Sequence, residues 1–284
     1  TTTTSAQAGV LENTPRLNYT PGVANPYLLL EPSRTNVISQ SEYFDSSEWA
    51  FFTGATLGSS FVVSPEGYNN ATTLNFGSGS ESLIFFDYSS GSATFTISVY
   101  ARSSTGKKFC FRNWNGSSAE RSSDFTTTTE WKRFEFTFTS AVVNFGICNE
   151  SSGVSGSIEI YGAQVEQGLA ATYATSYIPT YSVSATRAID VCSKTNASGE
   201  IGQTEGTLYA EVAKNNVLGG EGGFYLRKDS SNEIRLNLAT NNRLNLFVNV
   251  GGVNQAYMDN STFTLENYNK IAVKYKLNDY SVFV

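Results

Sequence analysis

The residues best suited to chemistry lie in a short stretch of aromatic and polar side chains at 109–116, which reads FCFRNWNG. Sugar binding needs a flat aromatic surface beside amide or carboxylate groups, because the apolar face of a sugar stacks on a ring while its hydroxyls bond to planar polar groups. If Phe109 and Phe111 face a core, Arg112 and Trp114 share the opposite face of the strand. The predicted ligand-binding surface contains Arg112, Asn113 and Trp114, with Tyr88 as a second ring. The alternative is that Trp114 covers a sheet edge or joins a subunit interface.

Catalytic chemistry finds little support in the sequence. The chain has 284 residues and no histidine, which excludes Ser-His-Asp triads, Cys-His pairs and the usual zinc sites. A glycosidase needs two carboxylates about 5–10 Å apart in a cleft. Carboxylates are available, but their spacing singles out no pair among Glu159, Glu166, Glu205 and Glu211. We predict that the protein is not an enzyme and has no catalytic residues, no metal site and no cofactor.

Hard oxygen ligands and thiols are present but form no recognisable metal motif. Asp45, Asp87 and Asp124 lie near turns, where they could hold a structural calcium, yet no EF-hand-type loop occurs. The chain has three cysteines, which lie far apart next to apolar strand patterns. We predict that Cys110, Cys148 and Cys192 are buried free thiols, with a Cys110–Cys148 bridge as the alternative if their strands are neighbours. The odd number favours a reducing compartment.

Alternating apolar and polar residues run through most of the chain and predict strands with one buried face. In residues 133–139, for example, Phe134, Phe136 and Phe138 share one face. Similar alternation occurs at 94–100, 234–238, 244–250 and 271–276, with glycine-containing turns between the segments. We therefore predict an all-β fold of two antiparallel β-sandwiches preceded by an extended arm.

Composition and charge narrow the class of partner. The formal net charge is −6, and an acidic chain without a basic stripe is a poor nucleic-acid binder. No apolar run approaches the ~20 residues of a membrane-spanning helix, so we predict no membrane insertion. The chain starts TTTTS without an initiator Met and stops in mid-alternation at residues 280–284, which favours a fragment of a longer polypeptide.

Three regions separate along the chain. Residues 1–35 are rich in proline and are predicted to form an extended N-terminal arm. Residues 36–180 form one strand-rich block, which ends at a linker with the sequence IPTYSVS. A second strand-rich block follows over residues 187–284 and is expected to be incomplete at its C-terminal end.

Several motifs occur in an order that is typical of tailed-bacteriophage fibre proteins. They are PRLNY at 15–19, LLLEPSRTN at 28–36, SPEGYNNAT at 64–72, TEWKRF at 129–134, IYGAQVEQG at 160–168, ATSYIPT at 174–180 and TRAID at 186–190. The chain therefore resembles a phage appendage protein over most of residues 13–190. The resemblance implies a jelly roll similar to carbohydrate-binding modules. The stretches EGTLYAE at 205–211 and KIAVKY at 270–275 resemble, more weakly, a laminin-G or concanavalin-like sandwich.

This resemblance implies a fibre or spike module of a phage virion, in the tail or the head. Its partners would be other virion proteins, further copies of itself in a homo-oligomer, expected to be a trimer, and host-surface carbohydrate. The alternative is a carbohydrate-binding module of a secreted enzyme or a bacterial adhesin. The motif around Arg34 and Glu31 is expected to act as a structural latch, in which Arg34 forks to a carboxylate or to backbone carbonyls. Docking of the arm is expected to bury Leu28, Leu29 and Leu30.

Overall fold

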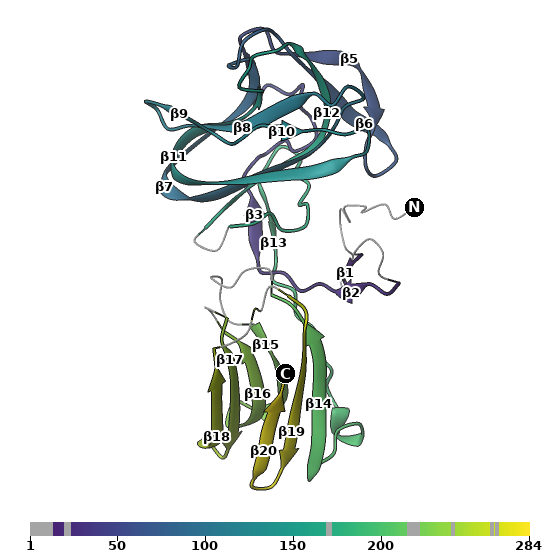
Figure 1. Ribbon diagram of the computed structural model, residues 1–284, viewed down its shortest axis with the longest axis vertical. Helices are drawn as coiled ribbons and strands as arrows, with labels where there is room; N and C mark the ends of the chain where they lie inside the picture. Colours follow the sequence, from purple (N-terminus) through teal and green to yellow (C-terminus); the bar gives the residue numbers. More distant parts are fainter. Residues whose placement is uncertain are drawn as a thin grey trace. The chain divides into compact units, whose positions relative to one another are not determined.

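The computed structural model describes residues 14–19, 24–168, 172–214, 222–239, 242–261, 264 and 267–284. The chain divides into two compact units, Thr1–Cys192 and Ser193–Val284, here called unit 1 and unit 2 (Figure 1). The described residues form antiparallel strands, with one 3-10 turn, η1 (Ala197–Gly199), as the only helical element among them. The predicted all-β class is confirmed. In the described part of the chain, no helix is long and apolar enough to cross a membrane.

Unit 1 is built on a sheet that folds back on itself. Its described strands are β1 (Leu17–Asn18), β2 (Tyr27–Leu28), β3 (Arg34–Asn36), β4 (Trp49–Phe52), β5 (Thr56–Val63), β6 (Asn69–Phe76), β7 (Leu83–Arg102), β8 (Lys108–Trp114), β9 (Ala119–Arg121), β10 (Phe125–Thr126), β11 (Lys132–Asn149), β12 (Gly156–Gln167) and β13 (Ala185–Arg187). Strands β1 and β2 pair only with each other. The remaining strands join in one hydrogen-bonded network.

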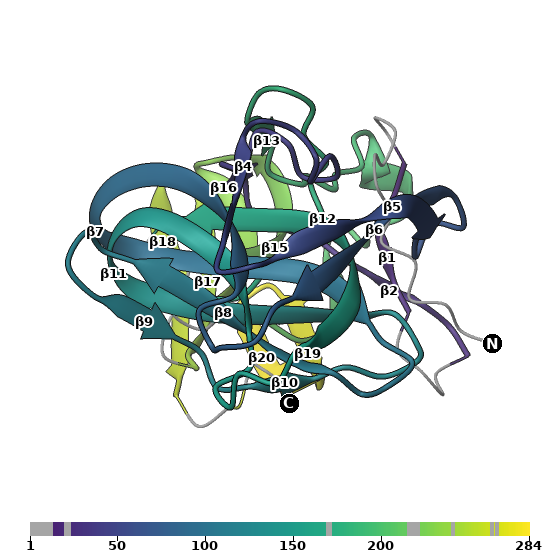
Figure 2. The same cartoon turned by 90° about the horizontal axis from the view of Figure 1, so that it is seen from above.

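The two longest strands, β7 and β11, belong to both layers of the sandwich. The first half of β7 pairs with β4 and with the second half of β11, which also pairs with β8. The second half of β7 pairs with the first half of β11 and with β12. The register shifts between Ser140 and Asn144, a β-bulge that lets the paired strands bend. Figure 2 shows both strands curving round at one edge of unit 1.

The core of unit 1 lies between these two layers. Alternation places Ile84, Phe86, Phe109, Phe111, Phe145 and Ile147 on the inner face of one layer. The inner face of the other layer contributes Phe95, Ile97, Val99, Phe134, Phe138, Ile160 and Val165. Burying a side chain of this size contributes about 1.5–3 kcal/mol. This core makes the strands that carry the exposed residues a rigid support.

The cysteines differ from the prediction of three buried thiols. Cys110 and Cys148 form a disulfide, while Cys192 is free and exposed. The bridge forms because the two residues lie directly opposite each other on β8 and β11, with Cα atoms 5.3 Å apart. Both sulfur atoms are buried beside Leu83, on the face that points away from the main core.

Four charged residues join the N-terminal segment to the end of unit 1, and we call Arg16, Glu31, Arg187 and Asp190 the latch. The buried Glu31 carboxylate lies 3.2 Å from Arg187 Nη1 and 3.6 Å from Arg16 Nε. Arg16 also pairs with Asp190 at 3.1 Å. The Ser176 N–H donates to Glu31 Oε1 at 2.8 Å. The latch is thus a buried ion-pair network rather than a single forked arginine.

One expectation about this segment was wrong, and the other is met only in part. Arg34 donates to a backbone carbonyl, that of its neighbour Ser33, while Arg187 makes the ion pair with Glu31. Leu28 and Leu30 are 48% and 52% exposed, so docking does not bury them. The physical reason is that, among the described strands, β2 pairs only with the two-residue strand β1, and no described sheet covers these leucines.

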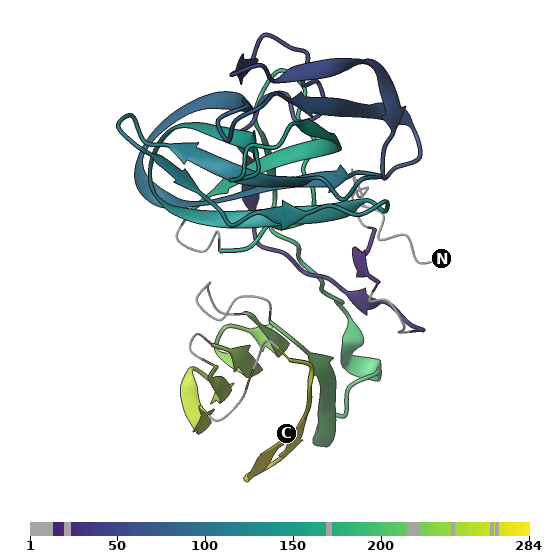
Figure 3. The ribbon, with the colours of Figure 1, turned by 45° about the horizontal axis from the view of Figure 1, so that its top comes forward.

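Unit 2 is a smaller sandwich of two sheets. The three-stranded sheet has the order β14 (Glu205–Val212), β19 (Asn269–Lys276) and β20 (Asp279–Phe283). The four-stranded sheet has the order β15 (Gly222–Asp229), β16 (Asn232–Leu238), β17 (Leu244–Val250) and β18 (Val253–Asn260). Figure 3 shows the two sheets facing each other. Their alternating apolar residues, Leu236, Leu246, Val248, Ile271 and Val273, fill the space between them.

The unit boundary falls later than the sequence pattern places it. Residues 34 and 35 were expected to belong to the arm, residues 185 and 186 to the stretch between the two strand-rich blocks, and residue 187 to the second domain. In the structure, residues 34–36 and 185–187 pair with each other as β3 and β13. Strand β3 also pairs with β12. Unit 1 therefore extends to Cys192.

Candidate functional site

The exposed face of the sheet around Trp114 is the candidate functional site. Trp114 on β8 lies opposite Asn144 on β11, which lies opposite Asp87 on β7. Residues paired in this way point to the same side of a sheet. The next row of the same face contains Arg112, Gly146 and Phe85. Arg112 and Trp114 thus lie together on the face that points away from the main core.

Arg112 is held firmly beside the indole ring. Its guanidinium carbon lies 5.2 Å from the centre of the Trp114 ring, within the range of a cation–π contact. Its Nε atom pairs with Glu81 Oε2 at 3.1 Å, and its Nη1 donates to Asn144 Oδ1 at 3.2 Å. Arg121 pairs with the other Glu81 oxygen at 3.1 Å. Burial lowers the pKa of Arg112 and the charge of Glu81 acts against that shift, so Glu81 keeps the guanidinium charged and in place.

The groups beside Trp114 offer hydrogen bonds to a ligand. Asp87 is exposed, and no described residue bonds to its carboxylate. Asn144 uses its carbonyl oxygen for Arg112, and no described residue accepts from its amide N–H groups. A planar ring, a free carboxylate and a free amide on one rigid surface match what a sugar requires. The two acidic and two basic side chains, Glu81, Asp87, Arg112 and Arg121, balance in charge, so the surface suits a neutral sugar.

Two of the predicted site residues lie elsewhere. Asn113 points to the opposite face and is fully buried, where its Nδ2 donates to Ser140 Oγ at 2.7 Å and to the Ala141 carbonyl at 3.1 Å. It therefore holds the bulge of β11. Tyr88 also lies on the core side, packed edge-on against Phe95 with its hydroxyl donating to Gln167. The two residues lie away from the site for the same reason. Each is next to an outward-facing residue of its strand, and adjacent residues of a strand point to opposite faces.

The sequence did not place Asp87, Asn144 and Phe85 on this surface; Asp87 was named only as a possible calcium ligand. Alternation within each strand predicts which face of the sheet each residue occupies. Their closeness to Trp114, however, depends on the register of three strands. The segment at 83–88 is apolar on both faces, which was a signal that its second face is also used. The residues on that second face, Leu83 and Phe85, pack around the disulfide.

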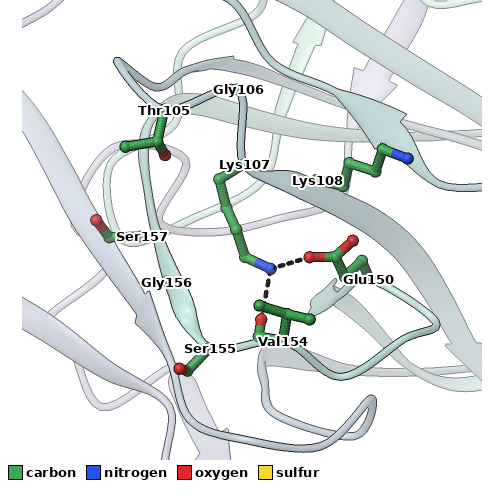
Figure 4. A pocket seen from close by; sticks show the side chains of 9 residues that line it. All are labelled: Thr105, Gly106, Lys107, Lys108, Glu150, Val154, Ser155, Gly156 and Ser157. Carbon is green, nitrogen blue, oxygen red and sulfur yellow. Dashed lines mark hydrogen bonds and ion pairs between the residues drawn. The ribbon is translucent and has the colours of Figure 1, made fainter.

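A pocket of about 500 Å³ lies between the β7–β8 and β11–β12 connections (Figure 4). Lys107 points into it and donates from Nζ to Asn149 Oδ1 at 2.8 Å, Glu150 Oε1 at 2.5 Å and the Val154 carbonyl at 2.6 Å. An ammonium group has three donors, and all three are used. Lys107 therefore ties the two connections together and has no donor left for a ligand or for proton transfer.

A second polar cluster brings together two carboxylates that the sequence did not pair, Glu42 and Glu66. Glu42 is buried and accepts from Tyr177 at 3.0 Å and from Tyr181 at 3.3 Å. Burial, reinforced by the charge of Glu42, raises the pKa of Tyr181 to about 12. Burial also raises the pKa of Glu66; the nearby Tyr161 hydroxyl opposes this shift and the charge of Glu42 adds to it. The cluster fixes residues 177–181 against the sheet.

Glu66→Gln is expected to stabilise the protein at neutral pH. A carboxyl with a raised pKa in the folded state favours folding only while it is protonated, and that contribution is lost as the pH rises through the folded pKa. The variant should therefore raise the urea midpoint at pH 7 and change it less at pH 4. Glu130→Gln, at an exposed position, serves as the control. Equal increases at both pH values would contradict this account.

The described residues contain no group of three or more His, Cys, Asp or Glu side chains placed to hold a metal ion. Two of the four carboxylates considered at first for hydrolysis, Glu159 and Glu166, lie in unit 1 and are engaged in other interactions. Glu159 pairs with Arg102, and the buried Glu166 accepts from the backbone and side chain of Thr175. These interactions give both glutamates structural roles.

Comparison with known proteins finds similar solved structures but no matching family or curated protein. No family model matches the chain, and no curated protein matches it. One similar solved structure is a family 29 carbohydrate-binding module, with 12% identity over 48% of this chain and 90% of that chain and a TM-score of 0.35. A variant of the second family 29 module in complex with cellulohexaose has 12% identity over 48% of this chain and 92% of that chain, with a TM-score of 0.35.

A third similar structure contains the CBM22-1 and GH10 modules of a xylanase from Clostridium thermocellum, complexed with xylohexaose. It has 13% identity over 51% of this chain and 30% of that chain, with a TM-score of 0.34. Similarity at these levels says nothing about a ligand of this protein. Any assignment of function rests on the side chains around Trp114.

Proposed function

We propose that the protein is a non-catalytic, carbohydrate-binding module, and that neutral sugars bind on the sheet face around Trp114. The observation that carries the proposal is the row Trp114–Asn144–Asp87 beside a charge-balanced Arg112. One face of the half-buried indole packs against Arg112, and in this proposal a sugar ring stacks on its other face. Because the donors and acceptors are held by a packed sheet, binding needs little reordering of side chains.

Trp114→Ala is expected to lower sugar affinity at least about tenfold, since an aromatic contact and its buried area together exceed ~1.4 kcal/mol. The measurement is a glycan array with the full chain, followed by titration monitored by tryptophan fluorescence. The chain has three tryptophans, and Trp49 is buried in the core. A ligand that stacks on Trp114 should change the emission of the wild type and not that of the variant.

Tyr68→Ala is the matched control, because Tyr68 is an exposed aromatic residue in the β5–β6 turn. Its loss should leave sugar binding unchanged. Asp87→Ala should weaken binding without changing stability, since no described residue bonds to that carboxylate. A sugar-dependent change in tryptophan emission that persists in the Trp114→Ala variant with the same affinity would refute this site.

The larger assembly is part of the same proposal. The ordered motifs at 15–36, 64–72, 129–134 and 160–190 support a fibre or spike module of a bacteriophage particle, displayed as a homo-oligomer, expected to be a trimer, for attachment to host-surface glycans. Mass spectrometry of purified particles and light scattering of the full-length polypeptide test these two points. Absence of the polypeptide from particles, together with a monomer at high concentration, would overturn this part.

One observation favours the second candidate, a module of a secreted enzyme or adhesin. The Cys110–Cys148 disulfide is of a kind that persists in oxidising compartments. It replaces the earlier expectation of reduced thiols. A catalytic domain in the full-length polypeptide would decide for this candidate, and a capsid- or tail-docking segment would decide for the phage appendage.

A further inference from the structure

The outer face of the four-stranded sheet in unit 2 carries an aromatic row that crosses all four strands. Tyr225 on β15 lies opposite Arg235 on β16, Arg235 lies opposite Phe247 on β17, and Phe247 lies opposite Tyr257 on β18. Neighbouring strands lie about 4.8 Å apart, so the row spans roughly 14 Å. Because directly paired residues share a face, these four side chains form one continuous line.

Polar residues with planar side chains flank this row on both sides. One flanking row contains Asn237, Asn245 and Asp259, and the other contains Arg227, Glu233 and Asn249. The alternate residues of the same strands, including Leu236, Leu246 and Met258, point into the core of unit 2. The two faces of the sheet thus differ sharply. We call the aromatic row and its two flanking rows the grid, and its described positions hold glycine, aromatic, amide or charged residues.

Interactions within the grid hold the rings in place. The Arg235 guanidinium carbon lies 4.4 Å from the centre of the Phe247 ring, and Phe247 and Tyr257 have ring centres 4.9 Å apart. At the other end, Arg227 lies 4.7 Å from the Tyr225 ring centre and pairs with Glu233 at 2.6 Å. Each arginine is therefore packed along a ring rather than extended into solvent.

Exposure is graded across the grid in a way that suits a ligand. The flanking Glu233 and Asn245 are buried, whereas Tyr225 is 46% exposed and Tyr257 is 52% exposed. Asn245 Nδ2 donates to Asp259 Oδ1 at 2.9 Å, and Asp259 also pairs with Arg243. The rings are therefore more exposed than the hydrogen-bonded polar side chains beside them. Because these polar side chains are already fixed, binding costs little side-chain entropy.

We propose that this face binds a neutral glycan chain that lies across the strands, along the line from Tyr225 to Tyr257. Stacking on rings and bidentate bonds to planar amide, carboxylate and guanidinium groups are the contacts that a chain of sugars requires. Three arginines reach this face, Arg227, Arg235 and Arg243. Each is paired with one of the two carboxylates, Glu233 or Asp259, so the face lacks the free clustered positive charge that a nucleic acid needs. It also lacks the aliphatic centre expected of a stable protein interface.

This surface is separate from the one proposed around Trp114, because it is built from strands of unit 2 alone. The test therefore uses the full chain with Trp114→Ala already introduced. Affinity electrophoresis is run in gels that contain galactomannan, xylan, dextran or hydroxyethylcellulose. The expected result is retardation in at least one gel. Tyr225→Ala and Tyr257→Ala should each weaken that retardation about tenfold, the loss of one ring contact.

Two variants serve as controls for these substitutions. Tyr257→Phe keeps the ring and should keep most of the binding. Tyr209→Ala removes an exposed tyrosine from the other sheet of the same unit and should change nothing. Sedimentation velocity of all variants tests the competing occupant, a second copy of the chain.

Three results would overturn the proposal. They are the absence of retardation in all four gels, retardation that survives both alanine variants, and dissociation of an oligomer by Tyr257→Ala without loss of sugar binding. None of these results bears on the Trp114 surface, whose own test follows the emission of tryptophans that all lie in unit 1.

Discussion

Glu31→Ala is expected to lower the free energy of unfolding by about 3–5 kcal/mol, the usual effect of removing one partner from a buried ion pair. The substitution leaves the Arg187 guanidinium, which is 14% exposed, without its carboxylate. Burial already lowers the pKa of Arg187, and the charge of Glu31 is the main opposing influence. The Ser176 N–H also loses its acceptor. The measurement is urea unfolding followed by tryptophan fluorescence.

The same experiment distinguishes the latch from a general loss of surface charge. Glu130→Ala removes an exposed carboxylate and should change the unfolding free energy by less than about 0.5 kcal/mol. A double-mutant cycle of Glu31→Ala with Arg187→Ala should show strong non-additivity, because the second substitution removes a partner that is already unpaired. Additive effects would contradict direct coupling between the two side chains.

Loss of the Cys110–Cys148 bridge is expected to destabilise unit 1 by about 4 kcal/mol. The bridge closes a loop with a sequence separation of 38 residues, and the chain-entropy relation gives about 4 kcal/mol for such a loop. The Cys110→Ala/Cys148→Ala variant should therefore unfold at a much lower urea concentration than the wild type. Both positions are fully buried, so lost packing adds to the entropic effect.

Reductant and a third cysteine variant provide the controls for the disulfide. Dithiothreitol should lower the urea midpoint of the wild type and leave that of the double-alanine variant unchanged. Cys192→Ala should leave the midpoint where it is, because this thiol is exposed and unbridged. A wild-type midpoint that is insensitive to dithiothreitol after full equilibration would argue against the bridge.

The alternation of residues predicted which side chains of each strand share a face, and little more. It placed Phe109 and Phe111 inward and Arg112 and Trp114 outward, as the structure has them. The same rule, applied consistently, would have removed Asn113 from the site, because it lies between two outward residues. Period-2 patterns therefore carry more information about a site than the clustering of suitable residue types does.

What the sequence could not predict depends on register and on distant contacts. Nothing local in the sequence pairs Asp87 with Asn144, or Arg235 with Phe247, since a shift of one residue would move each to the other face. The partners in the latch are also distant, with 159 residues between Glu31 and Asp190. The motif around Glu31 marked an important segment but could not name its partner.

The latch also sets an order in time. Arg16 and its partner Asp190 are 174 residues apart, and ribosomes add about 5–20 residues per second. Arg16 therefore waits roughly 10–35 seconds after its own synthesis before Asp190 exists to receive it. During that interval Glu31 is the partner within the latch that Arg16 already has. The prolines and charged residues of the N-terminal segment disfavour strand pairing with neighbouring chains, which protects the segment from aggregation until Asp190 has been synthesised.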